Sequence, residues 1–201
     1  MIIKTKKELR ALYGWPKGRA KSKVLEKLEK HSKNFLEHSP FFVMSTYDRN
    51  GRTDASPRGG YPGFVKIWDD QTILVPDAKG NNRVDSLVNL VETENIGCLF
   101  FIPGIEETLR INGTTKITTN PKYMELFQTA SNPPKTVLEI SITEVFLHCA
   151  KALMRSELWK DTYRKERPGF PTMGVMLNEQ LSTNVPLESQ EEMIKRYQKD
   201  L

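Results

Sequence analysis

The chain has 201 residues and a mass of 23.1 kDa, with 38% hydrophobic and 27% charged residues, which is typical of one folded domain rather than a disordered chain. No apolar run approaches the roughly 18–20 residues of a membrane span, and the first residues lack the apolar stretch of a secretory signal. The two cysteines, Cys98 and Cys149, are too few for a disulfide framework or a four-cysteine zinc site. We therefore expect a cytoplasmic protein with no membrane partner.

The net charge of +5 is unevenly distributed, because residues 1–37 carry +7 and the remaining residues carry −2. A basic segment of this kind can meet nucleic acid, an anionic surface or an acidic partner, or it can be a solvated helix face. We favour the solvated face, since no aromatic–basic interleaving or zinc-finger spacing indicates nucleic-acid binding.

The N-terminal region has helical spacing, and the segments that follow have strand patterns. Helices are expected over 6–12 and over 22–37, where apolar residues recur near a 3.6-residue period and Ser39-Pro40 ends the run. The expected strands span 41–47, 52–58, 64–68, 72–75, 96–102, 108–118 (interrupted at Asn112-Gly113) and 136–149. Further helices are expected over 82–92, 121–130 and 187–200, with a Pro/Gly-rich loop at 166–175.

About six strands joined mainly by hairpins, with a short helix between two of them, predict an α+β fold built on a six-stranded antiparallel barrel with peripheral helices. Strand–helix–strand units of regular spacing are missing, which argues against a parallel doubly wound sheet. We expect one domain over 1–201. It divides into an N-terminal helical extension (1–38), the barrel (39–159) and a C-terminal loop and helix (160–201).

The first candidate site is the strand end DASPRGG at 54–60. Pro57 has no N–H to donate, so the ladder stops there, and the following glycines let a ligand approach the backbone. Arg58 then presents a fork of donors suited to a phosphate or a polarised carbonyl. The alternative is a wide surface loop with an incidental arginine.

The second candidate is the strand-to-helix junction PDAKGNNR at 76–83. Asn81 or Asn82 is a natural N-cap, and the unpaired N–H groups of a first helical turn attract anions. Lys79 and Arg83 add positive charge, so a phosphate monoester fits the junction. Ordinary helix capping is the alternative, and the spacing of a Walker loop is absent.

The third candidate follows the last strand, at 148–159. Adjacent side chains of a strand point to opposite faces, so His148 cannot activate Cys149, for which we expect the role of an inert buried thiol. His148, Lys151, Arg155 and Trp159 can form a polar, aromatic-edged wall, or they can be a strand end followed by a cationic helix. The three histidines are scattered, and no metal or hydrolase motif is present.

In order and spacing, a series of blocks resembles the pyridoxamine 5′-phosphate oxidase-like family of FMN-binding split-barrel proteins, over about 39–159. These blocks are SPRG at 56–59, PGFV at 62–65, ILVPD at 73–77, GNNR at 80–83, LFFIPG at 99–104, ETLRING at 107–113 and HCAKA at 148–152. The resemblance implies a homodimer of six-stranded split barrels with FMN at the interface. Our leading hypothesis is an FMN-dependent oxidoreductase acting on a small molecule, with a nicotinamide as a candidate reductant.

The resemblance implies specific contacts to FMN. The flavin would lie against Ser56, Pro57, Arg58, Gly59, Pro76 and Asp77, its phosphate against Lys79, Asn81, Asn82 and Arg83, with further contacts from Thr108 and Arg110 and, in the second subunit, from His148, Lys151 and Arg155. No catalytic side chain is assigned.

Two features depart from the family. An acidic residue is usual where Gly60 stands, and the true oxidase ends in arginine- and histidine-rich stretches that grip pyridoxal phosphate, where this chain has LMRSE at 153–157 and QKDL at 198–201. These differences disfavour vitamin B6 oxidation. The alternatives are a non-catalytic flavin-binding or storage module, and a barrel that holds a deazaflavin or haem, with His148 as the axial ligand of the haem.

Overall fold

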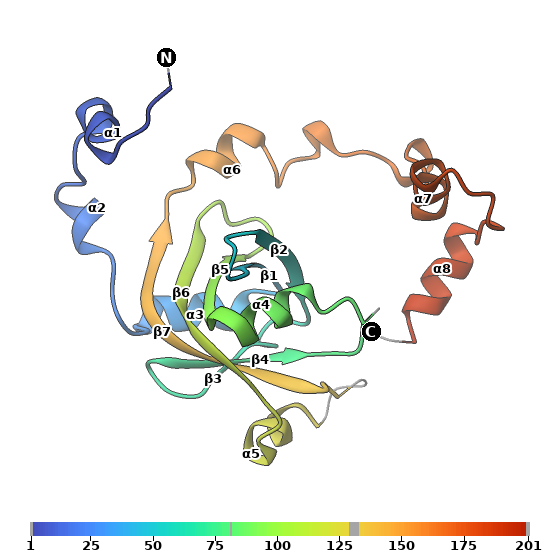
Figure 1. Ribbon diagram of the computed structural model, residues 1–201, viewed down its shortest axis with the longest axis horizontal. Coiled ribbons are helices and arrows are strands. Elements are labelled where there is room, and N and C mark those ends of the chain that lie inside the picture. Colours follow the sequence, from blue (N-terminus) through green and yellow to red (C-terminus); the bar gives the residue numbers. More distant parts are fainter. Residues whose placement is uncertain (1, 81, 129–132, 200–201) are drawn as a thin grey trace.

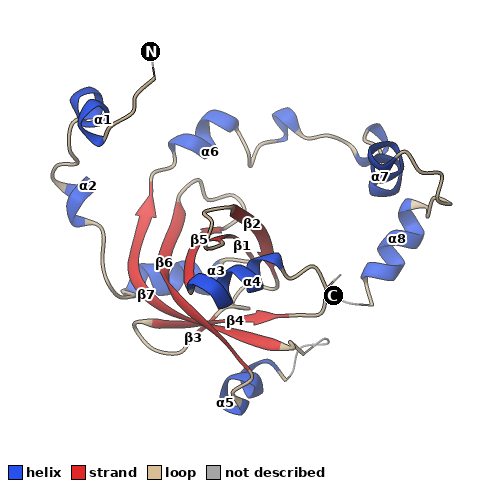
Figure 2. Ribbon diagram, viewed as in Figure 1, coloured by secondary structure: helices blue, strands red, loops and turns tan. Residues whose placement is uncertain are grey.

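The computed structural model describes residues 2–80, 82–128 and 133–199 (Figure 1). In these residues seven strands form one antiparallel sheet, in the order β2-β1-β5-β6-β7-β4-β3 (Figure 2). The strands are β1 (Phe41–Tyr47), β2 (Thr53–Gly59), β3 (Lys66–Ile67), β4 (Thr72–Asp77), β5 (Asn95–Phe101), β6 (Thr108–Thr118) and β7 (Thr136–His148). The α+β barrel prediction is confirmed, and the strand count is seven rather than six because the two residues of β3 pair with β4.

Two groups of helices accompany the sheet. α3 (Lys30–His38) and α4 (Asp85–Thr93) contribute buried residues to the barrel, and α5 (Pro121–Met124) follows β6. α1 (Lys6–Tyr13) and α2 (Arg19–Ser22) form an N-terminal arm, and α6 (Lys151–Ser156), α7 (Met173–Leu181) and α8 (Gln190–Tyr197) form a C-terminal arm. No residue of these five helices is buried; α1, α2, α7 and α8 extend away from the barrel, while α6 lies beside the outer face of the sheet (Figure 1). None of the described helices combines the length and apolar character needed to cross a bilayer.

The two longest strands, β6 and β7, carry the curvature of the sheet. Their pairing shifts register between Asn112 and Gly113, which is the interruption that the sequence predicts within 108–118. A Cβ atom at Gly113 would lie 2.1 Å from the carbonyl oxygen of Ser141, so only glycine allows this close approach. The bulge bends the strand pair, and the inner face of the sheet encloses the core.

That inner face is lined by alternate residues of the strands. Phe42 of β1 and Phe100 of β5 are fully buried, and their ring centroids lie 4.7 Å apart. Leu109 and Ile111 of β6 and Ile140 of β7 are also fully buried. The alternating pattern of each strand therefore sets one face toward the core and leaves the opposite face of the sheet outside.

The predicted helix over 22–37 is wrong in its first half, because α3 begins only at Lys30. Leu25 is instead extended and forms a bridge with Val145, with N–H to O distances of 3.0 Å and 2.7 Å. β4 pairs with β7 only as far as Ser141, so the rest of that edge offers unpaired backbone groups. The extended segment satisfies part of this edge, which outweighs its helical spacing.

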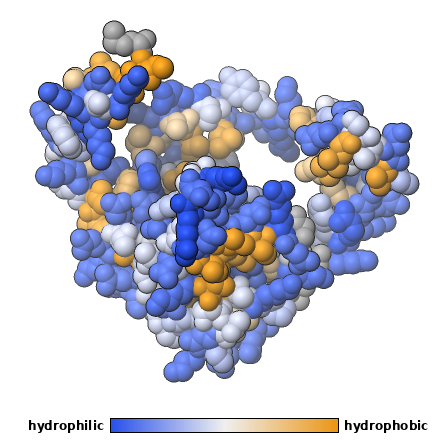
Figure 3. All heavy atoms as spheres, in the orientation of Figure 1, coloured by the Kyte–Doolittle hydropathy of each residue, from blue (hydrophilic) through white to orange (hydrophobic). Residues whose placement is uncertain are grey.

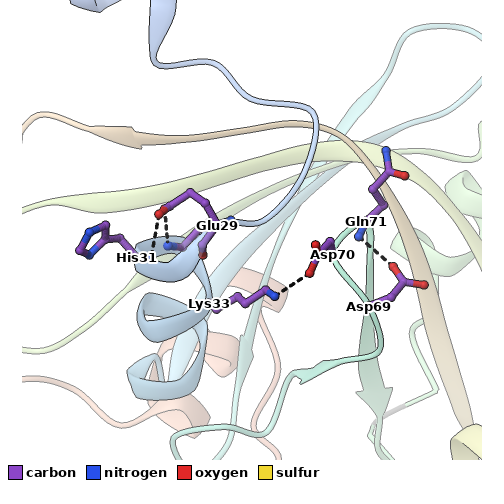
Figure 4. Close-up of polar contacts among 7 residues, drawn as sticks. Glu29, His31, Lys33, Asp69, Asp70 and Gln71 are labelled. Atoms are coloured by element: carbon purple, nitrogen blue, oxygen red, sulfur yellow. Dashed lines mark hydrogen bonds and ion pairs between the residues drawn. The ribbon is translucent and has the colours of Figure 1, made fainter.

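α3 is fixed at its start and along one side by polar contacts (Figure 4). The Glu29 carboxylate accepts hydrogen bonds from the backbone N–H groups of His31 (2.8 Å) and Ser32 (2.7 Å). Lys33 pairs with Asp70 of the β3–β4 turn at 2.6 Å. The hydrogen bond and charge of Lys33 lower the pKa of Asp70.

Two other helix predictions need correction. α5 ends at Met124 and continues as a 3₁₀ turn over Glu125–Phe127, while part of the predicted 121–130 helix lies outside the described residues. α7 begins at Met173, inside the predicted 166–175 loop, because the Thr172 hydroxyl accepts a hydrogen bond from the N–H of Val175 and caps the helix.

The packing predicts a large difference between a core and a surface aromatic residue. Phe100→Ala removes a fully buried ring and should lower the free energy of unfolding by about 3–5 kcal/mol. Tyr61→Ala is the control, since Tyr61 is 91% exposed and should change it by less than about 0.5 kcal/mol. Urea denaturation followed by circular dichroism measures both, and equal effects would contradict the assigned core.

Candidate functional site

An ion pair joins β2, at one end of the curved sheet, to β4, which lies next to the other end. β2 and β4 share no strand pairing in the described structure, yet the Arg58 guanidinium on β2 contacts the Asp77 carboxylate at the end of β4. Their side chains are 21% and 13% exposed. This pair therefore spans the seam between two strands that backbone hydrogen bonds do not join.

The same corner holds unsatisfied polar atoms. The Nε of Arg58 and the Oγ1 of Thr136 are buried without a hydrogen-bond partner in the described residues, and Thr136 is the register partner of Asp77. Buried polar atoms normally have a partner, so an orphaned donor indicates a place where a ligand accepts a hydrogen bond. Arg58 is the donor that the sequence predicts here.

The junction between β4 and α4 starts differently from the prediction. Asn82 adopts a left-handed conformation (φ 61°), and the N-cap of α4 is Val84, which provides no side-chain cap. The predicted N-cap at Asn82 is therefore wrong, because the chain turns at this residue before the helix begins. Asn81 lies outside the described residues.

Two cationic side chains lie on the junction between β4 and α4. Lys79 and Arg83 are both exposed, and the Nε of Arg83 lies 2.5 Å from an Oδ of Asp85. The hydrogen bond and charge of Asp85, and more weakly the charge of Asp54, raise the pKa of Arg83. Arg83 is thus within electrostatic reach of β2, and the uncapped first turn of α4 leaves backbone N–H groups beside it.

Two side-chain hydrogen bonds fix α4 against the sheet. The hydroxyl of Ser86 donates to the carboxylate of Asp54 on β2, and the Asn89 amide donates to the Thr46 hydroxyl at 3.0 Å. The first of these joins the start of α4 to the strand that carries Arg58. Nothing in the sequence marks Ser86 or Thr136 as part of this corner, since their roles depend on contacts between distant strands.

Other predicted residues lie on the outer face of the sheet. Thr108 is the register partner of His148, and Arg110 is the partner of both Leu99 and Phe146. They line a cavity of about 660 Å³ between the outer face and α6. Glu106, Asn112 and Cys149 also contribute to its lining.

One chain does not bring all the predicted residues together. Ser56 and Arg58 are half-buried on the inner side of β2, whereas Pro57 and Gly59 alternate with them and are exposed. Pro76 precedes Asp77 on β4 and is half-buried. The inner group at the seam and the outer group around Arg110 therefore lie on opposite faces of the sheet.

The wall predicted after β7 forms only in part. Lys151 and Arg155 are exposed on α6 and do not line the cavity, where Ala152 and Leu153 stand instead. The indole Nε1 of Trp159 donates to the carbonyl of Ile105 at 2.8 Å. This bond ties the segment after α6 to the β5–β6 connection.

The expectation of a buried thiol at Cys149 is wrong. Cys149 is exposed and lines the cavity, because β7 ends at His148 and the strand alternation does not extend further. Cys98 is the buried thiol, and burial raises its pKa to about 12. No cluster of potential metal ligands occurs within the described ranges.

The seam makes a prediction about stability. Asp77→Ala would leave the largely buried Arg58 without its ionic partner and should lower the free energy of unfolding by about 1–3 kcal/mol. Asp70→Ala, which breaks the more exposed pair with Lys33, should cost no more than about 1 kcal/mol. Paired urea titrations measure the difference, and an Asp70 effect as large as the Asp77 effect would contradict the structural role of the seam.

Solved structures share this fold at low sequence identity. A HupZ variant from Group A Streptococcus has a TM-score of 0.50 and 18% identity, covering 60% of this chain and 98% of that chain. A candidate pyridoxamine 5′-phosphate oxidase from Lactobacillus delbrueckii has a TM-score of 0.50 and 15% identity, covering 61% of this chain and 95% of that chain. These similarities show the fold alone. No curated protein sequence matches the chain significantly.

A protein-family model also matches the chain. The model described as pyridoxamine 5′-phosphate oxidase matches residues 28–149, more than half of the chain. The match begins at Leu28, the first buried residue of the core, and ends just after β7, so it covers the whole barrel and omits both arms. The resemblance read from the sequence blocks is confirmed, and the chain belongs to the pyridoxamine 5′-phosphate oxidase family.

Proposed function

We propose that this protein binds FMN at the seam and uses it as an oxidoreductase on a small molecule. The observation that carries the proposal is the Nε of Arg58, a buried donor near the β4–α4 junction that has no hydrogen-bond partner among the described residues. Asp77 partly neutralises the charge of Arg58. The Nε–H of Arg58 is therefore better suited to donate a hydrogen bond to a neutral ring carbonyl than to a second full negative charge.

The residues at the corner fit the two ends of FMN. Lys79 and Arg83, together with the uncapped N–H groups of the first turn of α4, form an anion site for the phosphate. Arg58, beside Asp77 and Ser56, provides the donor for the ring. When bound, FMN supplies hydride or electron transfer, while the chain supplies position and charge.

We also propose that the protein is a homodimer with FMN at the interface. The outer sheet face exposes apolar side chains such as Phe41, which is 38% exposed, and Tyr47, which is 42% exposed. Hydrophobic residues also occur on both arms (Figure 3). A second copy would cover this surface and bring the outer group of one chain, with Thr108, Arg110 and His148, toward the seam of the other.

We also propose a substrate and a reductant for the bound flavin. A small molecule is the proposed substrate and a nicotinamide is the proposed reductant, and vitamin B6 oxidation is disfavoured by the LMRSE stretch at 153–157. We place the protein in the cytoplasm on the basis of its sequence. No catalytic side chain is assigned, because the flavin carries the redox chemistry.

The proposed phosphate site predicts how much FMN affinity is lost when Arg83 is replaced. Arg83→Ala should weaken FMN binding by about 1.5–3 kcal/mol, as for the loss of a charged hydrogen bond. Arg52→Ala, which removes an exposed cation from the β1–β2 turn, is the matched control and should leave the affinity unchanged. Quenching of FMN fluorescence measures both, and an unchanged affinity for the Arg83 variant would remove this residue from the site.

Three measurements test the proposed function. The protein should take up about one FMN per chain and show flavin absorbance, and light scattering should give twice the 23.1 kDa chain mass. Anaerobic NADH or NADPH should bleach the bound flavin if the protein is an oxidoreductase. FMN binding without bleaching by either nucleotide would instead support a non-catalytic flavin-binding module, and a folded protein that takes up no FMN would refute the proposal.

A further inference from the structure

A cationic cluster surrounds Phe146 on the outer face of the sheet. The Nζ of Lys23 lies 5.1 Å and the Cζ of Arg110 lies 5.7 Å from the centre of its ring. The imidazole of His148 lies 5.1 Å from the same ring, between centroids. The three side chains come from the N-terminal arm, β6 and β7, so the fold and not a local motif brings them together.

Within the described part of the chain, no carboxylate forms an ion pair with these groups. Lys23 donates to the backbone carbonyl of Leu147 at 2.7 Å, and the Nε of Arg110 donates to the Asn112 amide oxygen at 3.3 Å. Both acceptors are neutral, so the positive charges are not compensated. Burial and the charges of Lys23 and Arg110 lower the pKa of His148, which agrees with a positive local field.

Two carboxylates lie nearby and limit this field without cancelling it. Glu144 accepts a hydrogen bond from the Asn112 side-chain amide at 2.8 Å. Glu106 is half-buried and lines the adjoining cavity. Neither forms an ion pair with Arg110 among the described contacts, so the guanidinium can accept an external anion.

The cluster opens into the cavity of about 660 Å³, to which Arg110 and His148 contribute. The other side of the cavity is apolar and includes Val43, Leu99 and Phe101. A volume of this size is typical of small-molecule sites, in which apolar walls hold the body of a ligand and a few polar groups fix its orientation. The lining therefore suits a molecule with one anionic end and one apolar end.

We propose that this cavity binds a small organic carboxylate, whose anionic group pairs with Arg110 and whose apolar body packs against Val43, Leu99 and Phe101. Lys23 and His148 strengthen the positive field at its mouth. The inference rests on the proposed function in one respect, since the bound carboxylate would be the reactant that meets the flavin. In the proposed homodimer the second copy covers this face, so the cavity lies at the interface between the two copies. Binding of the anion itself requires no flavin.

Benzoate tests the proposal, and benzamide is its neutral counterpart of similar shape. Isothermal titration into the full-length protein, with and without saturating FMN, should show benzoate binding at least tenfold more tightly than benzamide. Arg110→Gln should weaken benzoate binding at least tenfold and leave benzamide unchanged. Lys116→Gln removes an exposed cation from the same strand and should leave both affinities unchanged. Matching thermal melts establish that the variants are folded.

The outcomes separate this inference from the flavin proposal. Equal binding of benzoate and benzamide, or an equal loss in the Lys116 variant, would overturn the carboxylate site. Competition between benzoate and FMN would overturn it as well, because the cavity would then belong to the flavin. FMN binding without benzoate binding would refute this inference alone. Benzoate binding without FMN binding would support the cavity and refute the proposed function.

Discussion

The contact between Arg58 and Asp77 is the constraint that organises the site, because it closes a sheet that backbone pairing leaves open. β2 ends the sheet on one side, and β4 lies next to the end on the other. Holding them together places the β4–α4 junction beside β2, where Ser86 bonds to Asp54. A cationic loop, a helix start and an arginine with a buried Nε thus meet at one corner.

The same closure separates two chemical environments. Residues that alternate along each strand face either the core or the outer surface, so neighbours in sequence such as Pro57 and Arg58 belong to different faces. The inner seam offers a buried donor and a nearby anion site. The outer face offers a cavity with Arg110 at its polar end. In a homodimer, as proposed above, the outer surface of one copy faces the seam of the other.

Much of this fold is predictable from local signals. The strands 41–47 and 108–118 agree with β1 and β6 at both ends, because their β-forming residues also alternate between core and surface. Even the interruption at Gly113 is a visible signal of the bulge. The helix prediction is wrong at 23–29 because the open edge of β7, which holds Leu25 extended, is formed by residues more than a hundred positions away.

Some residues of the candidate site are likewise predictable from the sequence, and others are not. Arg58 and the junction at 76–83 are predictable because strand ends and helix starts have local chemistry. Thr136 and Lys23 are not, since they reach their places only through the register of β4 with β7 and the path of the N-terminal arm. The start of α4 is also not predictable. Asparagine is a good N-cap residue, but Asn82 forms a left-handed turn, and the helix begins after it, with Val84 as the N-cap.

The most direct test of the central claim is a crystal structure of the protein grown with excess FMN. The account predicts the phosphate against the β4–α4 junction, the ring within hydrogen-bond distance of Arg58, and a second chain over the outer face. An isolated chain, or a well-ordered flavin bound away from the Arg58–Asp77 seam, would contradict it.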